Sequence, residues 1–219
     1  MSKHKFNAQN EVNDNFELFP TPRWATRGFL NAFSGVTGQS LSSMSFLEPA
    51  CGFGDISEVL KEYTNQPVYS YDIQSLGYGE TRDFLKSDHF EPVDMVITNP
   101  PFSHLVSFFH RAKSISRRWV ALMQRTPVLE GNKRHSEVYQ HSPPKHVFQY
   151  VERVPMVKGR IDKNATTNMP YLWMVWDLKD ESGVTNLHWI APCRKELEKD
   201  FDYGRHTDII ERADSGLPF

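Results

Sequence analysis

The chain has 219 residues, enough for one domain of ordinary size with a full hydrophobic core. Hydrophobic residues make up 39% and charged residues 24%, a composition that excludes a disordered protein. The net charge of −2 is unevenly divided, because residues 105–165 carry twelve Lys and Arg against four Asp and Glu, which suggests either a face for a polyanion or a solvated basic surface.

Strand and helix patterns alternate along the first two thirds of the chain. Residues 43–55 predict a strand, a glycine-containing turn and a helix start, with Asp55 placed to cap a helix over residues 56–63. The other elements of this part are predicted strands over residues 67–73, 93–97 and 118–123 and a helix over residues 105–115. Such alternation predicts an α/β fold with right-handed crossovers, a mostly parallel sheet and helices on both faces.

The pattern changes after residue 146. Residues 147–154 and 171–178 are two predicted strands with no helix between them, which indicates an antiparallel pair at the edge of the sheet. Beyond residue 192 the sequence predicts a helix and a frayed end, to which we assign no function.

Neither a membrane segment nor a metal site is expected. No apolar run approaches the ~20 residues of a membrane span, and the polar amino terminus lacks the apolar region of a signal peptide. Cys51 and Cys193 are far apart and form no CxxC pattern, which gives no support to a zinc site and fits a reducing cytoplasm.

Binding sites of open parallel sheets lie beyond the carboxyl ends of the strands. Three turns of unusual composition follow predicted strands: "EPACGFGD" (48–55), "YDI" (71–73) and "NPPF" (99–102). Gly52 and Gly54 would let a ligand approach the backbone closely, although such a turn by itself is equally consistent with a structural role. Asp72 lies 18 residues after Gly54, where an acid can accept hydrogen bonds from ribose hydroxyls. Together these turns predict a site for a nucleoside cofactor.

The first turn also indicates the charge of this cofactor. Position 57 is Ser57 where the dinucleotide fingerprint has its third glycine, and Glu48 would repel a pyrophosphate. S-adenosylmethionine suits the turn better, because its amino group and sulfonium are positive and its ribose can meet Asp72.

With "FPTP" (19–22), these motifs resemble motifs X, I and IV of the amino-methylating DNA methyltransferases, in that order. The order is similar to the γ-like arrangement, and small phage or prophage adenine-N6 methyltransferases are the nearest match. The resemblance implies a Rossmann-like class I methyltransferase with a seven-stranded, mostly parallel sheet and an antiparallel edge pair. It places a methyltransferase domain over residues 16–192, between a flexible segment (1–15) and a carboxyl-terminal extension (193–219), in a bacterial or phage-infected cell.

The resemblance also implies a role for individual residues around the cofactor. Residues that would close over its methionine part are Phe19, Thr21 and Pro22, and those that would hold its amino and carboxyl ends are Glu48, Pro49, Ala50, Gly52 and Gly54. Asp72 would bind the ribose. Ile73, Asp83 and Phe84 would meet the adenine, although Ile73 and Phe84 also suit an ordinary core.

The turn "NPPF" then has a chemical role. The exocyclic nitrogen of adenine is a poor nucleophile, and methylation leaves positive charge on it, so acceptors should be in place before the charge develops. Asn99 offers a side-chain oxygen and Pro100 a carbonyl, and Pro100 and Pro101 restrict the turn. Phe102 offers a flat face for an extruded base. The alternative is a plain Asn-Pro turn at a strand end.

The target would be a flipped adenine in duplex DNA or an adenine in a single strand. Lys and Arg residues that can neutralise phosphates are Arg111, Lys113, Arg117, Arg118, Lys133, Arg134, Lys158, Arg160 and Lys163. Residues 154–170 form the one predicted loop rich in donors. Because the chain leaves no room for a separate target-recognition domain, we expect relaxed or short sequence specificity, or help from a partner subunit such as a second copy in a homodimer.

Other functions remain open at this stage. Asn-Pro-Pro-aromatic turns also resemble those of ribosomal RNA amino methyltransferases and protein-glutamine methyltransferases, and DNA cytosine-N4 methylation is a further alternative. A non-catalytic nucleic-acid-binding protein on a methyltransferase scaffold is an alternative of a different class.

Overall fold

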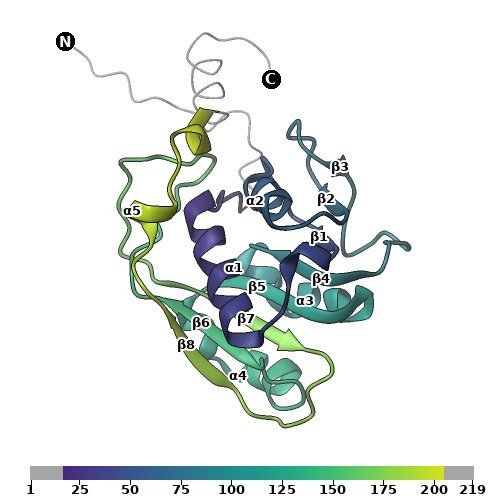
Figure 1. Cartoon of the computed structure of the whole chain (residues 1–219). Coiled ribbons are helices and arrows are strands. Elements are labelled where there is room, and N and C mark those ends of the chain that lie inside the picture. The colour runs from purple at the N-terminus through teal and green to yellow at the C-terminus, as the bar shows by residue number, and fades with distance from the viewer. Residues whose placement is uncertain (1–16, 205–219) are drawn as a thin grey trace, which may run out of the picture.

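The computed structural model describes residues 17–204, so the predicted flexible segment 1–15 and the end of the extension, 205–219, lie outside the described residues. The described chain forms an eight-stranded sheet in the order β3-β2-β1-β4-β5-β7-β6-β8 (Figure 1). The strands are β1 (Phe46–Glu48), β2 (Val68–Asp72), β3 (Glu80–Thr81), β4 (Val93–Thr98), β5 (Ser116–Arg125), β6 (His146–Tyr150), β7 (Tyr171–Asp177) and β8 (Asn186–Ile190). β1 to β5 pair in parallel, β7 is antiparallel to β5 and β6, and β8 is parallel to β6.

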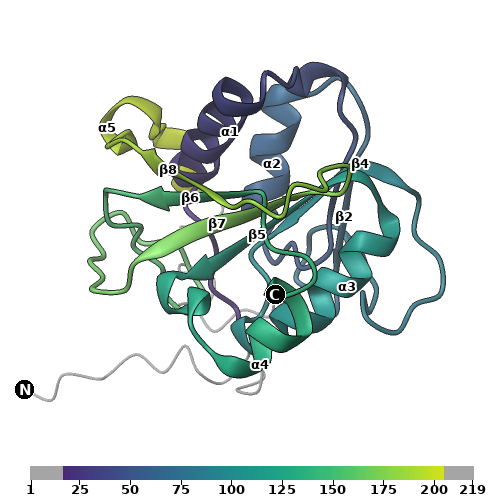
Figure 2. The ribbon, with the colours of Figure 1, turned by 90° about the horizontal axis from the view of Figure 1, so that it is seen from below.

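Helices cover both faces of the sheet (Figure 2). α1 (Arg23–Thr37) and α2 (Asp55–Tyr63) lie on one face, and α3 (Leu105–Ile115) and α4 (Asn132–Arg134) lie on the other. The shorter elements are the 3-10 turns η2 (Leu41–Ser43), η3 (Phe102–His104), η4 (Thr126–Leu129) and η6 (Asp200–Tyr203), the π-helical turn η5 (His135–Tyr139) and α5 (Arg194–Leu197).

Two apolar cores result from the alternation of side chains along each strand. Phe46 and Met95 belong to the core under α1 and α2, whereas their chain neighbours Leu47 and Val96 belong to the core under α3. The central strands are therefore almost continuously apolar, as expected for strands buried on both faces.

The predicted Rossmann-like α/β fold is confirmed, with eight strands in place of seven. The predicted antiparallel pair exists as β6 and β7, but it does not form the edge, because β8 lies beyond β6. The prediction missed β8, a strand of five residues whose apolar Leu187 and Trp189 lie on the exposed side, so its apolar positions do not mark a buried face. It also missed α1, which starts after Pro22 without a side-chain cap.

Within the described residues, no helix is long and apolar enough to cross a membrane. In the same part of the chain, no group of three or more His, Cys, Asp or Glu side chains is arranged to hold a metal ion.

Candidate functional site

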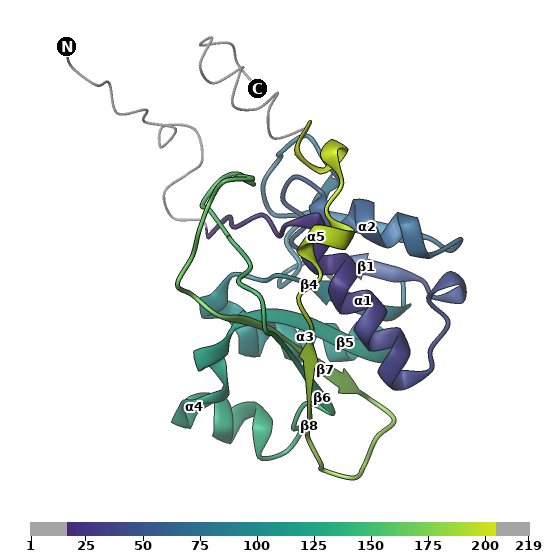
Figure 3. The ribbon, with the colours of Figure 1, turned by 60° about the vertical axis from the view of Figure 1, so that its left-hand side comes forward.

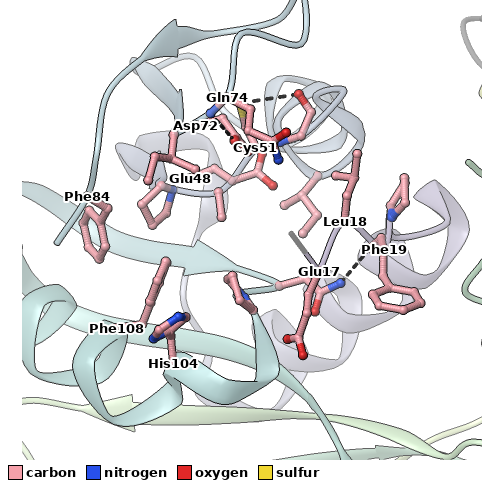
Figure 4. Close-up of a pocket in the computed structure, with 18 of the residues that line it drawn as sticks. Glu17, Leu18, Phe19, Glu48, Cys51, Asp72, Gln74, Phe84, His104 and Phe108 are labelled. Atoms are coloured by element: carbon pink, nitrogen blue, oxygen red, sulfur yellow. Dashed lines mark hydrogen bonds between the residues drawn. The ribbon is translucent and has the colours of Figure 1, made fainter. Parts of the chain in front are cut away.

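The three unusual turns meet at the edge of the sheet that is formed by the carboxyl ends of its parallel strands. β1 lies between β2 and β4 and is parallel to both, so the carboxyl ends of the three strands are adjacent. A cavity of about 330 Å³ lies at this edge (Figure 4). The predicted residues that line it are Phe19, Thr21, Glu48, Pro49, Ala50, Gly52, Asp72, Ile73, Asp83, Phe84, Asn99 and Pro101; those that do not are Pro22, Gly54, Pro100 and Phe102.

Sequence reasoning missed other residues of the cavity wall. They include Glu17, Leu18, Cys51, Gln74, His104 and Phe108. Most are chain neighbours of the predicted motifs, and Phe108 lies one helical turn beyond His104 at the start of α3. Extending each motif by its flanking residues and the next helical turn would have found them.

The two glycines of the first turn have different roles. Both have positive φ, +52° at Gly52 and +89° at Gly54. A Cβ at Gly54 would lie 2.5 Å from the ring of Tyr78, so this glycine is required by packing at the start of α2. Gly52 lines the cavity, and a Cβ there would lie 2.9 Å from Leu18.

Asp72 ends β2 and points to the same turn. Its carboxylate accepts hydrogen bonds from the Gly52 amide (2.8 Å) and the Gln74 amide (2.9 Å), which hold it against the cavity. Burial raises the pKa of Asp72, and the backbone hydrogen bonds oppose that rise.

Glu48 is the most deeply buried acid of the cavity wall, with 1% of its surface exposed. The Ser57 hydroxyl donates to Glu48 Oε2, and Ser57 Oγ also lies 2.6 Å from Ser70 Oγ. The residue at the third-glycine position therefore orients the acid. Burial raises the pKa of Glu48 well above its usual value, and the nearby carboxylates of Asp55 and Asp72 add to this. A cation in the cavity would favour the ionised form.

The predicted adenine contacts differ in exposure. Phe84 is buried and packs against Phe90 and Phe108 at centroid distances of 5.4 and 5.2 Å, so it belongs to the core as well as to the cavity wall. Ile73 is 48% exposed and lines the cavity without joining the core. Asp83 Oδ1 accepts hydrogen bonds from the Leu85 and Lys86 amides.

Asn99 uses the two ends of its amide differently. Its Nδ2 donates to the Phe19 carbonyl (2.9 Å) and to Thr21 Oγ1 (3.2 Å). Because the Phe19 carbonyl can only accept, the amide orientation is determined. Oδ1 is buried and has no hydrogen-bond partner between residues 17 and 204. The turn thus presents an unpaired acceptor beside the cavity, which Asn99 lines.

Phe102 lies in an aromatic group beside the cavity. Its ring centroid is 5.9 Å from that of Phe19 and 6.3 Å from that of Tyr171. The Arg125 guanidinium carbon lies 4.3 Å from the Phe102 centroid, so a stacked base would use the other ring face or displace Arg125. The Phe102 amide donates to Glu17 Oε2 at 2.6 Å.

The predicted loop over residues 154–170 lies next to the first described residues, which precede α1 (Figure 3). The Gly159 amide donates to the Leu18 carbonyl at 2.9 Å, and Met156 Sδ lies 3.7 Å from Asn99 Nδ2. Lys158 and Arg160 flank Gly159, so two of the predicted cations are near the site, whereas Lys163 Nζ lies 3.5 Å from Asp200 Oδ1.

The nine candidate phosphate-binding cations do not lie together in the structure. Arg117 and Arg118 lie in the first residues of β5, at the opposite edge of the sheet from Asn99, and Arg118 pairs with Asp177 at 2.9 Å. Arg111 donates to the carbonyls of residues 87 and 88, and Arg134 to those of residues 128 and 130. Lys113 donates to Ser142 at 3.3 Å, and Lys133 lies 4.0 Å from Glu137. These last four side chains hold or contact neighbouring segments, because long cationic side chains satisfy nearby carbonyls, hydroxyls and acids.

A second cavity, of about 430 Å³, lies at the other half of the same edge. Thr126, Gln149 and Trp189 are among its lining residues, and Trp189 is 66% exposed.

Comparison with known proteins defines the fold class. No protein-family model and no curated protein matches the chain. Among solved structures, the methyltransferase subunit of a type I restriction-modification system from Streptococcus thermophilus is similar with a TM-score of 0.56 and 13% identity, over 93% of this chain and 55% of that one. This chain therefore spans about half the length of that subunit.

Two further structures have a TM-score of 0.53. A proposed RNA methyltransferase from Pyrococcus horikoshii is 16% identical, over 73% of this chain and 85% of that one. A proposed class I S-adenosylmethionine-dependent methyltransferase from Listeria monocytogenes is 11% identical, over 96% and 75%. The chain thus has the Rossmann-like fold of the class I methyltransferases.

Proposed function

We propose that this protein transfers a methyl group from S-adenosylmethionine to the N6 amino group of adenine in DNA. The observation that carries the proposal is the unpaired, buried Oδ1 of Asn99 at the end of β4. A buried acceptor without a partner costs on the order of 1–3 kcal/mol, so its retention beside a cavity indicates that a ligand donor completes it.

The cavity fits the proposed cofactor. Glu48 is buried there and its pKa is raised by burial, so a bound ammonium group would supply the counter-charge that the site lacks. Asp72 lies at the end of the neighbouring strand for ribose hydroxyls, and Gly52 leaves room for close approach. When bound, S-adenosylmethionine supplies a methyl group made electrophilic by the adjacent sulfonium.

Two oxygen atoms of the chain would accept hydrogen bonds from the N6 amino group of the target adenine. In this proposal Asn99 Oδ1 accepts a hydrogen bond from one N–H, and the Pro100 carbonyl accepts from the other. Both acceptors favour the developing positive charge, and the Phe19 carbonyl and Thr21 hydroxyl keep the Asn99 amide from rotating. Neither amide oxygen is basic enough to retain the proton that the methylated nitrogen releases, so this proton passes to water.

The loop near Asn99 supports a polyanionic substrate. Lys158 and Arg160 are adjacent to the site, because they flank Gly159, which contacts Leu18 of the cavity wall. The restriction-modification likeness favours DNA over RNA as the carrier of the target base. We propose short or relaxed sequence specificity, because recognition of bases beside the target would rest on this one short loop.

The test is methyl transfer from tritiated S-adenosylmethionine to separate DNA, ribosomal RNA and protein samples, followed by nucleoside analysis. N6-methyladenine from DNA is the expected product. N4-methylcytosine, label in RNA or label in protein would replace the substrate assignment. Absence of cofactor binding by calorimetry would instead indicate a non-catalytic protein.

A further inference from the structure

Arg125 lies next to the turn and was not among the predicted cations. It is the last residue of β5, three positions beyond Leu122, which pairs with Thr98 of β4. Its guanidinium lies over Phe102 at 4.3 Å and near Phe19 at 5.6 Å. Arg125 is thus a cation one strand away from Asn99, stacked on the aromatic residue that follows the two prolines.

No acidic side chain among the described residues balances the charge of Arg125. None of the ion pairs between residues 17 and 204 includes it, and its buried Nε has no hydrogen-bond partner there. Other arginines of the chain are neutralised: Arg27 pairs with Asp202 and Arg118 with Asp177. The polar group that interacts with Arg125 is the neutral hydroxyl of Tyr171, which does not balance its charge. A partly buried cation without a carboxylate partner is costly, which favours binding of an anion at this site.

We infer that Arg125 binds a backbone phosphate next to the target adenine. This inference rests on the proposed function. A guanidinium that stacks on a ring can still donate from its edge, and its fork of N–H groups matches two phosphate oxygens. The second cavity begins at the next residue, Thr126, so a nucleic-acid strand has space to continue along the same edge of the sheet.

The experiment pairs a protein variant with a change in the phosphate. The probe is a single-stranded oligonucleotide with one adenine among thymines, made with ordinary linkages or with a neutral methylphosphonate on the 5′ or the 3′ side of the adenine. Loss of a hydrogen bond to a charged group is worth about 1.5–3 kcal/mol, so wild-type affinity should fall on the order of 10–100-fold for one of the two neutral linkages. Arg125→Gln should weaken binding of the ordinary probe similarly and then be insensitive to that linkage.

Arg118→Gln is the matched control. Arg118 also stacks on an aromatic ring, that of Trp119 at 4.6 Å, but it pairs with Asp177 at the opposite end of β5. This variant should keep the wild-type response to the neutral linkage, and Arg125→Lys should recover part of it.

Equal sensitivity of wild type and Arg125→Gln to both neutral linkages would overturn the inference. A loss of kcat alone in Arg125→Gln, with affinity intact, would also overturn it, because Arg125 would then only position Phe102. Binding is measured apart from methyl transfer, so wild type that binds the probe without methylating it contradicts the proposed function and leaves the phosphate contact to be judged by the binding data.

Discussion

Single residues of the site depend on partners that are distant in the chain. The Asn99 amide is held by Phe19 and Thr21, and the Glu48 carboxyl by Ser57. In both cases one end of the side chain is fixed by the protein while the group faces a cavity. Substitutions can therefore separate binding, catalysis and stability.

Asn99→Ala should remove catalysis without removing the cofactor site. Loss of one preorganised acceptor of this kind reduces the rate by roughly 10²–10³-fold, and cofactor affinity should change little because the acceptor acts mainly on the transition state. Methyl transfer to adenine-containing DNA and calorimetry with the cofactor are the measurements. A variant that methylates at the wild-type rate would show that the turn has no catalytic role.

Glu48→Gln should stabilise the ligand-free protein at neutral pH and weaken cofactor binding. Because the folded-state pKa of Glu48 is raised, the folded state binds more protons than the unfolded state, so stability falls as pH rises from the ordinary value towards the raised one. Removing the ionisable group should make this fall shallower. A gain on the order of 1 kcal/mol corresponds to about 2–4 °C in Tm for a domain of this size.

Thermal unfolding of wild type and Glu48→Gln across pH tests the first part. Calorimetry tests the second: wild-type affinity for the cationic cofactor should increase with pH as Glu48 ionises, and the variant should show less of this increase. Superimposable pH profiles of the two proteins would contradict both parts.

At the scale of elements, one buried arginine joins three segments. Arg27 of α1 donates to both oxygens of Asp202 in η6 at 2.8 Å, and it also donates to Glu62 of α2 at 2.6 and 2.8 Å. The described part of the carboxyl-terminal extension is therefore anchored to α1 and α2.

Asp202→Asn should destabilise the protein, because it leaves the Arg27 guanidinium buried with one carboxylate less. Removing one partner of a buried pair costs on the order of 3–5 kcal/mol, and Glu62 should keep the loss near the lower end. Asp200→Asn is the control, since Asp200 lies in the same turn but is fully exposed. Denaturant unfolding that gave the same midpoint for both variants would contradict the anchoring role.

At the scale of the whole molecule, charge is distributed between two edges of the sheet. Lys158 and Arg160 lie in the loop beside the candidate site, whereas Arg117 lies near the start of β5 at the opposite edge. With a target base in the turn, as we propose, the first group would lie along the bound strand and Arg117 would not.

DNA binding should therefore weaken with salt, with a slope of about −0.7 to −0.9 per neutralised phosphate. Replacing Lys158 and Arg160 together by Gln should reduce the magnitude of that slope by about 1.4–1.8, if each residue neutralises one phosphate. Arg117→Gln should leave the slope unchanged. Fluorescence anisotropy at several salt concentrations measures all three, and a slope that the double variant does not alter would exclude the loop as a phosphate contact.

The sequence by itself determined the features that depend on local pattern. Alternation of strands with helices gave the fold class, and glycines, prolines and acids at strand ends located the edge where the cavity lies. These signals are local because the hydrophobic period and turn chemistry are set by residues close in the chain. Asn99, Asp72 and Glu48 were found in this way.

Only the tertiary structure decided which distant groups meet. The place of β8 at the edge, the use of Ser57 to orient Glu48 and the stacking of Arg125 on Phe102 depend on strand order and packing. Long cationic side chains are the extreme case. The excess of Lys and Arg over residues 105–165 left open a face for a polyanion or a solvated basic surface, and in the structure several of these side chains reach nearby carbonyls, hydroxyls or carboxylates. The partner of a flexible charged side chain depends on which groups the folded chain brings within a few ångströms, and no local pattern encodes that distance.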